Sequence, residues 1–264
     1  MAVGKNGRMG GALLGVCCLF FGTVSVSDAQ RLSIDPSLIP SEDEQAKERD
    51  PFDELLNEPV YEDETLRKYY RTRSVVPHRY KRVALRANEL VSAGQLDQGG
   101  RYYQKILDEY PDSLFALSNL AVVQFRRGQF RQAILLLEKA LVNAPDDAFV
   151  HSTLGICHFE LGELDLAVKA LNQSITLDPG DARTRNFMAI VSSEKGWWGA
   201  AEKECLRAIE LDPEYSGGYY NLANVYAYRP TPDVSLAREY YKKALKAGHP
   251  PNEEIEKKIN YSAK

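Results

Sequence analysis

Residues 128–145 read GQFRQAILLLEKALVNAP, and residues 162–179 read GELDLAVKALNQSITLDP. Both stretches begin with glycine, continue with apolar residues at helical spacing and end with proline, and they start 34 residues apart. The same two residue types recur at this period along the chain, as Gly94, Gly128, Gly162 and Gly196, and as Pro111, Pro145, Pro179 and Pro213. Two residue types that share one period and one phase indicate an internal repeat.

The period divides residues 80–251 into five units when the glycine is given repeat position 15 and the proline position 32. The units span 80–113, 114–147, 148–181, 182–215 and 216–251, and the fifth lacks the glycine and gains two residues around 229–232. Small residues recur at repeat positions 8 and 20, as in Ala121 and Ala133, and large apolar residues recur at positions 7 and 17, as in Leu120 and Phe130. This spacing predicts one amphipathic helix on each side of the glycine.

The glycine and the proline each have a structural reason to stand where they do. Glycine tolerates a positive φ, which suits the residue that ends a helix. Proline cannot continue a helix, so it ends the second helix of each unit. Each unit is therefore predicted to be helix, tight turn, helix. The small residues, such as Ala167 at position 20, are expected to let two helix axes approach closely.

These units resemble tetratricopeptide repeats. That family favours Leu at position 7, Gly or Ala at 8, Gly at 15, Ala at 20 and 27 and Pro at 32, and the segments 133–141, 221–226 and 240–245 match its helices well. The resemblance implies an all-α fold, an α-solenoid of about five helix-turn-helix units. The chain departs from the pattern at position 4, which is never Trp, and at position 7 of the first unit, where Arg86 suggests an atypical N-terminal unit.

The resemblance also implies where a partner would bind. In the family, positions 2, 5, 9, 12 and 13 of the first helix line a groove that holds a peptide or a helix. Carried over, the candidate groove residues are Asn88, Phe115, Ser118, Val122, Phe125, Phe149, Ser152, Ile156, Phe159, Arg183, Asn186, Ile190, Tyr220, Asn224 and Tyr228. Because the centre of this set is apolar, we expect docking by apolar side chains with a few hydrogen bonds, not capture of a carboxylate.

Two other interpretations of the groove residues stay open. Some of them, in particular the row Val122, Ile156 and Ile190 at position 9, can instead pack between repeats. Alternatively the chain's own residues 50–79 can fill the groove.

The first 29 residues have the pattern of a secretory signal peptide. Lys5 and Arg8 precede an apolar stretch, and small residues lie at positions 27 and 29, before the expected cleavage site. An exported protein of the periplasm or cell envelope is therefore predicted. Two forms of membrane tethering remain alternatives: an uncleaved anchor, and lipid attachment at Cys17, for which Leu14 fits and Val16 is too large.

Residues 30–79 are predicted to be a largely disordered leader. Twelve acidic and two basic residues lie between positions 35 and 64, whereas residues 65–86 carry eight basic residues and no acid. The stretch has too few apolar residues to offset the entropy of the chain. A short helix near 61–73 is plausible, with acids at its start and bases at its end.

Residues 252–264 are predicted to form a capping helix. Asn252 can accept hydrogen bonds at the N-cap. Glu253 and Glu254 fall in the first turn, and Lys257 and Lys258 lie nearer the end. A polar terminal helix covers the open end of a repeat array.

No catalytic constellation is apparent, and no enzyme activity, metal or cofactor is predicted. His151 and His158 are seven residues apart, about 10 Å on a helix, too far for one zinc ion. Cys157 and Cys205 have no base and orienting group that the sequence places beside them. Of the two tryptophans, Trp198 is at a core position and Trp197 is expected to be more exposed.

The overall balance of charge argues against nucleic acid as a partner. The chain of 264 residues has a net charge of −4, whereas a nucleic-acid binder usually has a basic excess. The prediction is an exported protein-interaction scaffold that acts in envelope assembly or secretion. A structural module that self-associates and a non-catalytic accessory subunit of an envelope enzyme complex are the alternatives.

Overall fold

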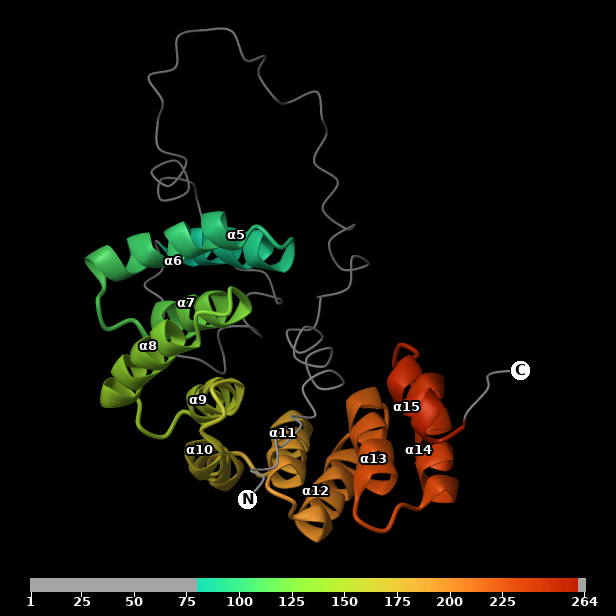
Figure 1. Cartoon of the computed structure of the whole chain (residues 1–264). Coiled ribbons are helices and arrows are strands. Elements are labelled where there is room, and N and C mark those ends of the chain that lie inside the picture. The colour runs from blue at the N-terminus through green and yellow to red at the C-terminus, as the bar shows by residue number, and fades with distance from the viewer. Residues whose placement is uncertain (1–79, 261–264) are drawn as a thin grey trace, which may run out of the picture. The chain divides into compact units, whose positions relative to one another are not determined.

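The computed structural model describes residues 80–260, and every regular element in that range is a helix (Figure 1). The helices follow one another in antiparallel pairs, one pair for each repeat, which confirms the predicted all-α fold class. The predicted signal peptide and the acidic and basic leader lie outside the described residues. Within residues 80–260, none of the helices has the length and apolar character that crossing a membrane would require.

The described residues form two compact units. The first, within residues 80–143, contains α5 (Lys81–Ser92), α6 (Leu96–Glu109), α7 (Leu114–Arg126) and α8 (Phe130–Asn143). Each helix in it packs on the next one along the chain.

The second unit, within residues 144–260, contains three further pairs and a final short helix. The pairs are α9 (Ala148–Glu160) with α10 (Leu164–Leu177), α11 (Ala182–Glu194) with α12 (Trp198–Leu211), and α13 (Ser216–Tyr228) with α14 (Val234–Lys246). The last helix is α15 (Glu253–Lys258), which contacts α13.

The periodic glycines end the first helix of four repeats, as predicted. Gly94, Gly128, Gly162 and Gly196 have φ between +74° and +80°. In each case the amide of the next residue donates to the carbonyl five positions earlier, for example Gln129 N to Gln124 O at 2.9 Å. This 6→1 hydrogen bond defines a Schellman turn, and it is why a residue without a Cβ is favoured there.

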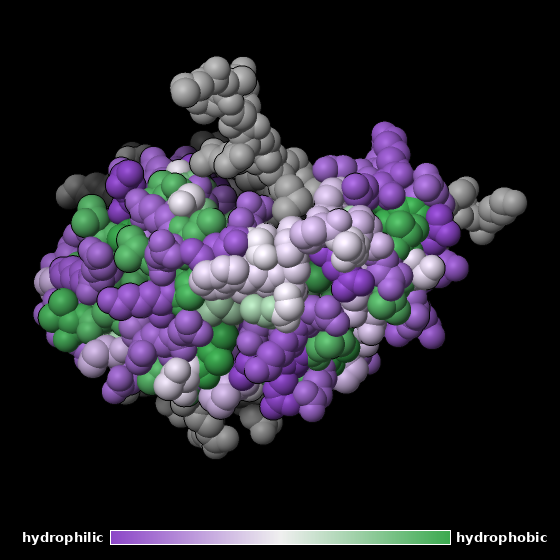
Figure 2. Space-filling model, turned by 60° about the horizontal axis from the view of Figure 1, so that its bottom comes forward, coloured by the Kyte–Doolittle hydropathy of each residue, from purple (hydrophilic) through white to green (hydrophobic). Residues whose placement is uncertain are grey.

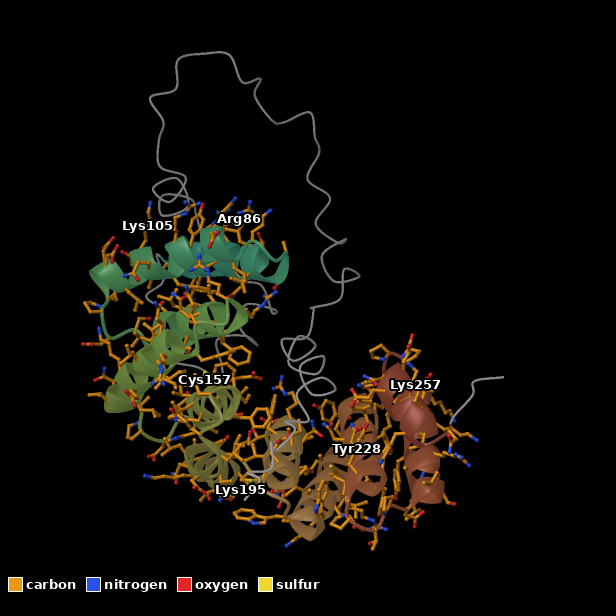
Figure 3. All side chains as sticks on the ribbon, in the orientation of Figure 1. Arg86, Lys105, Cys157, Lys195, Tyr228 and Lys257 are labelled. Atoms are coloured by element: carbon orange, nitrogen blue, oxygen red, sulfur yellow. The ribbon has the colours of Figure 1, made fainter. Side chains whose placement is uncertain are left out.

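Close approach of the two helices in a repeat depends on the small residues. Ala133, Ala167, Ala201 and Ala237 at position 20 are completely buried. A Cβ added to Gly155, at position 8, would lie 2.7 Å from Cγ of Leu171, so the approach of α9 and α10 depends on the missing side chain. By contrast Arg86, at position 7 of the first repeat, is exposed and pairs with Glu89 at 3.0 Å on its own helix (Figure 3).

The terminal helix α15 is capped as expected. Oδ1 of Asn252 accepts from the amides of Glu254 at 3.0 Å and Ile255 at 3.2 Å. Ile255 and Ile259 are buried, and the Tyr241 hydroxyl of α14 donates to Glu256 at 2.8 Å. The helix is therefore held to the last repeat by apolar burial and by polar contacts together.

Candidate partner-binding surface

The aliphatic row at repeat position 9 is buried. Val122 on α7, Ile156 on α9 and Ile190 on α11 all lie on first helices, and each exposes only a small part of its surface. Val122 belongs to the first compact unit, and the other two belong to the second. These side chains are therefore largely enclosed in their units, and any partner would reach only their edges.

The four phenylalanines of the predicted set divide by unit. Phe115 and Phe125 on α7 are buried, with ring centroids 6.0 Å from Tyr103 and 5.4 Å from Phe130 respectively. In the second unit Phe149 and Phe159, both on α9, are half-buried. The half-buried pair thus offers more accessible aromatic surface than the pair on α7.

The polar members of the set in the first unit are engaged within it. Ser118 is buried and donates to the carbonyl of Phe115 at 3.2 Å, one turn earlier on α7. Asn88 on α5 accepts a hydrogen bond from the hydroxyl of Tyr103 on α6. Both side chains therefore stabilise the helix packing of this unit.

A chain of buried polar contacts links the first helices of the second unit. Ser152 on α9 lies 2.9 Å from the hydroxyl of Thr184 on α11, which donates to Asp181 at 2.8 Å. Asn186 on α11 is fully buried, and its Oδ1 accepts from Asn221 on α13 at 2.9 Å.

Tyr215 adds one more hydrogen bond to these contacts, which the repeat pattern did not predict. Asp147 and Asp181 cap the preceding first helices with their side chains, but Tyr215 at the equivalent place makes no cap hydrogen bond. Its ring lies over Gly217, where an added Cβ would be 2.9 Å from the ring, and its hydroxyl accepts from Asn186 at 3.2 Å. Burial raises the pKa of Tyr215, which keeps the phenol neutral.

The predicted residues of the fifth repeat face the terminal cap. Tyr220 on α13 is 1% exposed, and its ring stacks on His249 with centroids 4.0 Å apart and planes 8° from parallel. The Tyr228 hydroxyl donates to Glu254 of α15 at 3.5 Å, and Lys258 lies 5.4 Å from the Tyr228 ring centroid. Burial, and secondarily Glu254, raise the pKa of Tyr228 to about 12.

Two polar atoms on α13 are shielded from solvent and have no hydrogen-bond partner, namely the Tyr220 hydroxyl and Oδ1 of Asn224. Burial raises the pKa of Tyr220, and the nearby amide of Asn224 opposes this rise without reaching hydrogen-bond geometry. A buried polar atom without a partner costs about 1–3 kcal/mol, so a ligand or water that supplied the missing bonds would be stabilised here.

Arg183 is the most exposed member of the predicted set. It lies at position 2 of the fourth repeat, on the first turn of α11, and its Nε is 3.5 Å from Asp181. Its guanidinium is therefore available on the surface of the second unit.

Repeat position 4 has a role that the sequence comparison did not reveal. His151, Arg185 and Tyr219 each hydrogen-bond to the carbonyl of the periodic proline six residues earlier, at 2.7, 3.2 and 3.1 Å. That carbonyl follows the end of a helix and would otherwise lack a donor. The three side chains are thus structural.

The buried cysteines and His158 of the described residues show no sign of a catalytic or metal-binding role. Burial raises the pKa of Cys157 to about 12, so the group stays a thiol at neutral pH (Figure 3). Burial likewise raises the pKa of Cys205. His158 pairs with Glu163 at 2.7 Å. Within residues 80–260 no group of His, Cys, Asp or Glu side chains is arranged to hold a metal ion.

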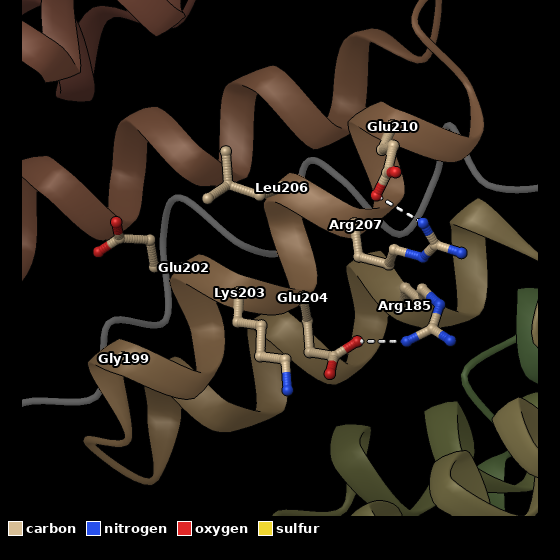
Figure 4. A pocket seen from close by; sticks show the side chains of 8 residues that line it. All are labelled: Arg185, Gly199, Glu202, Lys203, Glu204, Leu206, Arg207 and Glu210. Carbon is tan, nitrogen blue, oxygen red and sulfur yellow. Dashed lines mark hydrogen bonds and ion pairs between the residues drawn. The ribbon is translucent and has the colours of Figure 1, made fainter.

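An open hollow of about 510 Å³ lies on α12, with Arg185 of α11 at its edge (Figure 4). Its charged side chains are largely paired with one another, Arg185 with Glu204 at 3.0 Å and Arg207 with Glu210 at 2.5 Å. The hollow is therefore an ionic surface and not an apolar ligand cavity.

The two tryptophans of the fourth repeat differ in exposure. Trp197 is 49% exposed, as expected, and Lys195 lies 4.6 Å from its ring centroid. Trp198, expected in the core, is only half-buried. Lys195 also pairs with Asp165 of the preceding repeat at 2.5 Å, and Arg127 pairs with Asp97 at the equivalent repeat positions.

Successive helix pairs of 34 residues, with Schellman turns and small residues between the helices, define the class of helical repeat proteins. The family model of the tetratricopeptide repeat matches residues 85–148 and 119–182. Residues 85–182 therefore match the tetratricopeptide repeat family. The fold of this family is a scaffold for protein–protein interaction and generally lacks catalytic activity.

Solved structures agree with this assignment. A crystal structure of MamA is 25% identical, with a TM-score of 0.53, and the match covers 61% of this chain and 93% of MamA. The thermophilic protein TTC0263 of Thermus thermophilus is 20% identical, with a TM-score of 0.58 over 67% of this chain and 95% of that protein.

A third structure, YrrB, is described as a TPR protein with an unusual peptide-binding site. It is 22% identical with a TM-score of 0.50, over 66% of this chain and 88% of YrrB. The likeness to TTC0263 and to YrrB shows the fold alone. No curated protein shows significant sequence similarity to the chain.

Proposed function

We propose that this protein is an exported scaffold that binds a peptide or helix of a partner protein through the first helices of its repeats. The observation that carries the proposal is the pair of unmatched polar atoms on α13, the Tyr220 hydroxyl and Oδ1 of Asn224. A backbone amide of a bound segment would supply the donor that Asn224 lacks. The peptide-binding site of YrrB, a protein of the same fold, supports a peptide as the ligand.

The second unit contributes the accessible part of this surface. Phe149 and Phe159 on α9 are half-buried and can contact apolar side chains of the bound segment, and Arg183 on α11 is exposed. Export is supported by the sequence of residues 1–29, and a role in envelope assembly or secretion is proposed on that basis.

Site-specific photo-cross-linking of the full chain tests the proposal. A photoreactive amino acid in place of Asn224 is expected to cross-link one defined partner in cells. The same amino acid in place of Lys203, exposed on α12, is the matched control and should give little cross-linking. Equal products from both positions would contradict a binding surface on the first helices.

A second variant measures the contribution of the Asn224 side chain to binding. Asn224→Ala removes the acceptor. The free energy of binding to the cross-linked partner should become less favourable by about 1 kcal/mol, the net contribution of one hydrogen bond. The thermal unfolding of the variant should be unchanged or improved, because the buried acceptor is unmatched without a partner. Unchanged affinity would show that Asn224 is not a contact.

A further inference from the structure

The second helices of the repeats present an outer stripe that is exposed in every repeat. The stripe consists of repeat positions 18, 22, 25 and 29, shifted by two residues in the fifth unit, and all twenty of its residues are exposed. Because these positions are spaced by four, three and four residues, they lie on one side of a helix. The five repeats therefore provide five internal versions of the same surface.

On four of the five helices positions 22 and 29 are polar. Position 22 is Arg101, Lys169, Lys203 and Glu239, and position 29 is Asp108, Thr176, Glu210 and Lys246. On α8 the same two positions are Leu135 and Val142, which are 66% and 80% exposed. Exposure of this extent shows that neither side chain contributes to the core of its unit, so an apolar pair on α8 has no explanation in the fold of the repeats.

The spacing of the pair indicates what kind of surface covers it. Leu135 and Val142 are seven residues apart, so they lie on nearly the same side of α8, two turns from each other. An apolar pair at heptad spacing is the seam along which a second helix packs. Leu135 and Val142 provide only two apolar contacts along the helix, so a helix that packs there must gain further stabilisation from the flanking charges.

Those flanking charges point to a second copy of α8. Glu138 and Lys139 lie between the two apolar layers and fall on opposite sides of the seam. If two copies pack in parallel about a two-fold axis, Glu138 of each copy faces Lys139 of the other. In an antiparallel pair Glu138 would face Glu138, and like charges would oppose the contact.

Neither charge is used elsewhere on α8. The residues three and four positions away from Glu138 and from Lys139 are all uncharged, so no ion pair within the helix competes. Glu138 makes no ion pair or hydrogen bond with the described residues, and Lys139 has one exposed partner, Asp112, at 4.0 Å. We propose that the protein self-associates through α8, with two copies of the helix parallel and Leu135, Glu138, Lys139 and Val142 at the contact.

The contact is self-complementary and limited in area. Arg131, one turn before Leu135, places like charges at the start of the paired helices and ends the apolar seam. Weak, concentration-dependent dimerisation is therefore expected. This inference does not rest on the proposed binding of a partner, because it involves none of the residues of the first helices.

Sedimentation of the full chain across a concentration series tests the association. The mass is expected to rise from 29.7 kDa towards twice that value. Leu135→Gln together with Val142→Gln should weaken the dimer about tenfold or more, which corresponds to about 1.4 kcal/mol. The matched control is Leu206→Gln on the outer stripe of α12, where the leucine is 42% exposed, and it should leave the dimer unchanged. A wild-type chain that stays monomeric, or a dimer insensitive to the double variant, would overturn the proposal.

Exchange of the charges at Glu138 and Lys139 tests whether a second copy of α8 forms the contact and whether the two helices are parallel. Glu138→Lys alone and Lys139→Glu alone should each weaken the dimer, because each places like charges opposite one another. The double variant Glu138→Lys with Lys139→Glu should restore it, since positions 138 and 139 of the two chains would again carry opposite charges in a parallel pair. The pair with Asp112 is altered equally in Lys139→Glu and in the double variant, so it does not affect that comparison. Failure of the double variant to restore the dimer would overturn the parallel arrangement of two copies.

Disulfide trapping gives an independent readout of the orientation. In a background of Cys17→Ser and Cys18→Ser, Leu135→Cys should form a covalent dimer under mild oxidation, because position 135 meets its own counterpart in a parallel pair. Cys157 and Cys205 are buried and should not react. Lys169→Cys, the equivalent position on α10, is the control. A covalent dimer that forms equally well with Lys169→Cys would contradict the α8 contact.

Discussion

The first and second helices of each repeat are nearly equal in length, but in every repeat except the first, the first helix has more buried residues than the second. In the second repeat nine of the thirteen residues of α7 are buried, against three of the fourteen of α8. The fourth and fifth repeats show the same contrast, nine against three in α11 and α12 and in α13 and α14. From the second repeat on, the first helices thus supply most of the buried residues, whereas the second helices mainly form surface.

This contrast explains why the two kinds of helix can carry different functions. On a first helix a buried polar side chain is stabilised by a partner inside the protein, as Asn186 is by Asn221. On a second helix a change of residue at an outer position meets only solvent. A binding surface on the first helices therefore depends on the fold, whereas a contact on the second helices can be gained without altering it.

The largest effect is expected where the two helices of a repeat meet. Ala167→Trp should unfold the second unit, because Ala167 is fully buried at the closest approach of α9 and α10 and the large ring has no space. Lys169→Trp, two residues later on the exposed face of α10, is the control and should leave the circular dichroism melting curve nearly unchanged. Similar curves for both variants would disprove the close-approach argument.

A smaller loss is expected for a polar side chain of a first helix. Asn186→Ala leaves the amide of Asn221 without its acceptor and should lower the free energy of unfolding by about 1–3 kcal/mol. Asn172→Ala, on the exposed side of α10, should have little effect in chemical denaturation. If the two alanine variants were equally stable, the chain of polar contacts between first helices would not contribute to stability.

A still smaller effect is expected from pH at the terminal cap. Burial lowers the pKa of His249 below 6.5, against a minor opposing contribution of the Pro250 carbonyl, so the neutral ring is favoured in the folded state. The unfolded chain then binds the proton more readily, and stability that is present above pH 6.5 is lost as the pH falls. The protection of the α15 amides against hydrogen exchange, corrected for the intrinsic rate, should therefore fall as the pH is lowered from neutral towards the folded pKa.

The control for this effect keeps the stack and removes the titration. His249→Phe retains an aromatic ring against Tyr220, and its exchange should change less over the same pH range after correction for the intrinsic rate. An equal change in the variant would show that another group titrates.

The smallest effect is expected at the ion pair between Asp165, exposed on second helix α10, and Lys195, which follows the end of α11. Asp165→Asn breaks the pair with Lys195, and the melting temperature should hardly move, because Asp165 is exposed and exposed ion pairs contribute little. Asp181→Asn, which alters the cap of α11 and the contact with Thr184, is the informative comparison and should lower it more. The reverse order would contradict the contrast between the two kinds of helix.

The sequence alone predicts the repeat and its turns because their causes are local. A positive φ at Gly128 and the end of a helix before Pro145 depend on a few neighbouring residues. The cap at Asn252 is predictable for the same reason.

The candidate surface was harder to predict because burial depends on neighbouring repeats. Periodicity places Asn186 and Ile190 on one side of a first helix, but it does not show how much of each side chain the next repeat covers. His249 stacks on Tyr220, which lies 29 residues earlier in the chain. The repeat pattern does not predict this contact. The hydrogen bond of Tyr215 with Asn186 requires Gly217, where a Cβ would lie 2.9 Å from the ring, and the reason for this glycine appears only once the ring is placed.

The bond from position 4 to the proline carbonyl has a consequence for how such repeats can diverge. An imidazole, a guanidinium and a phenol satisfy the same acceptor in three consecutive repeats. The requirement is for any donor of sufficient reach, not for a particular ring or charge. Substitutions among such residues should therefore be tolerated during evolution, and a search pattern that demands one residue type at this place would overlook repeats that are structurally intact.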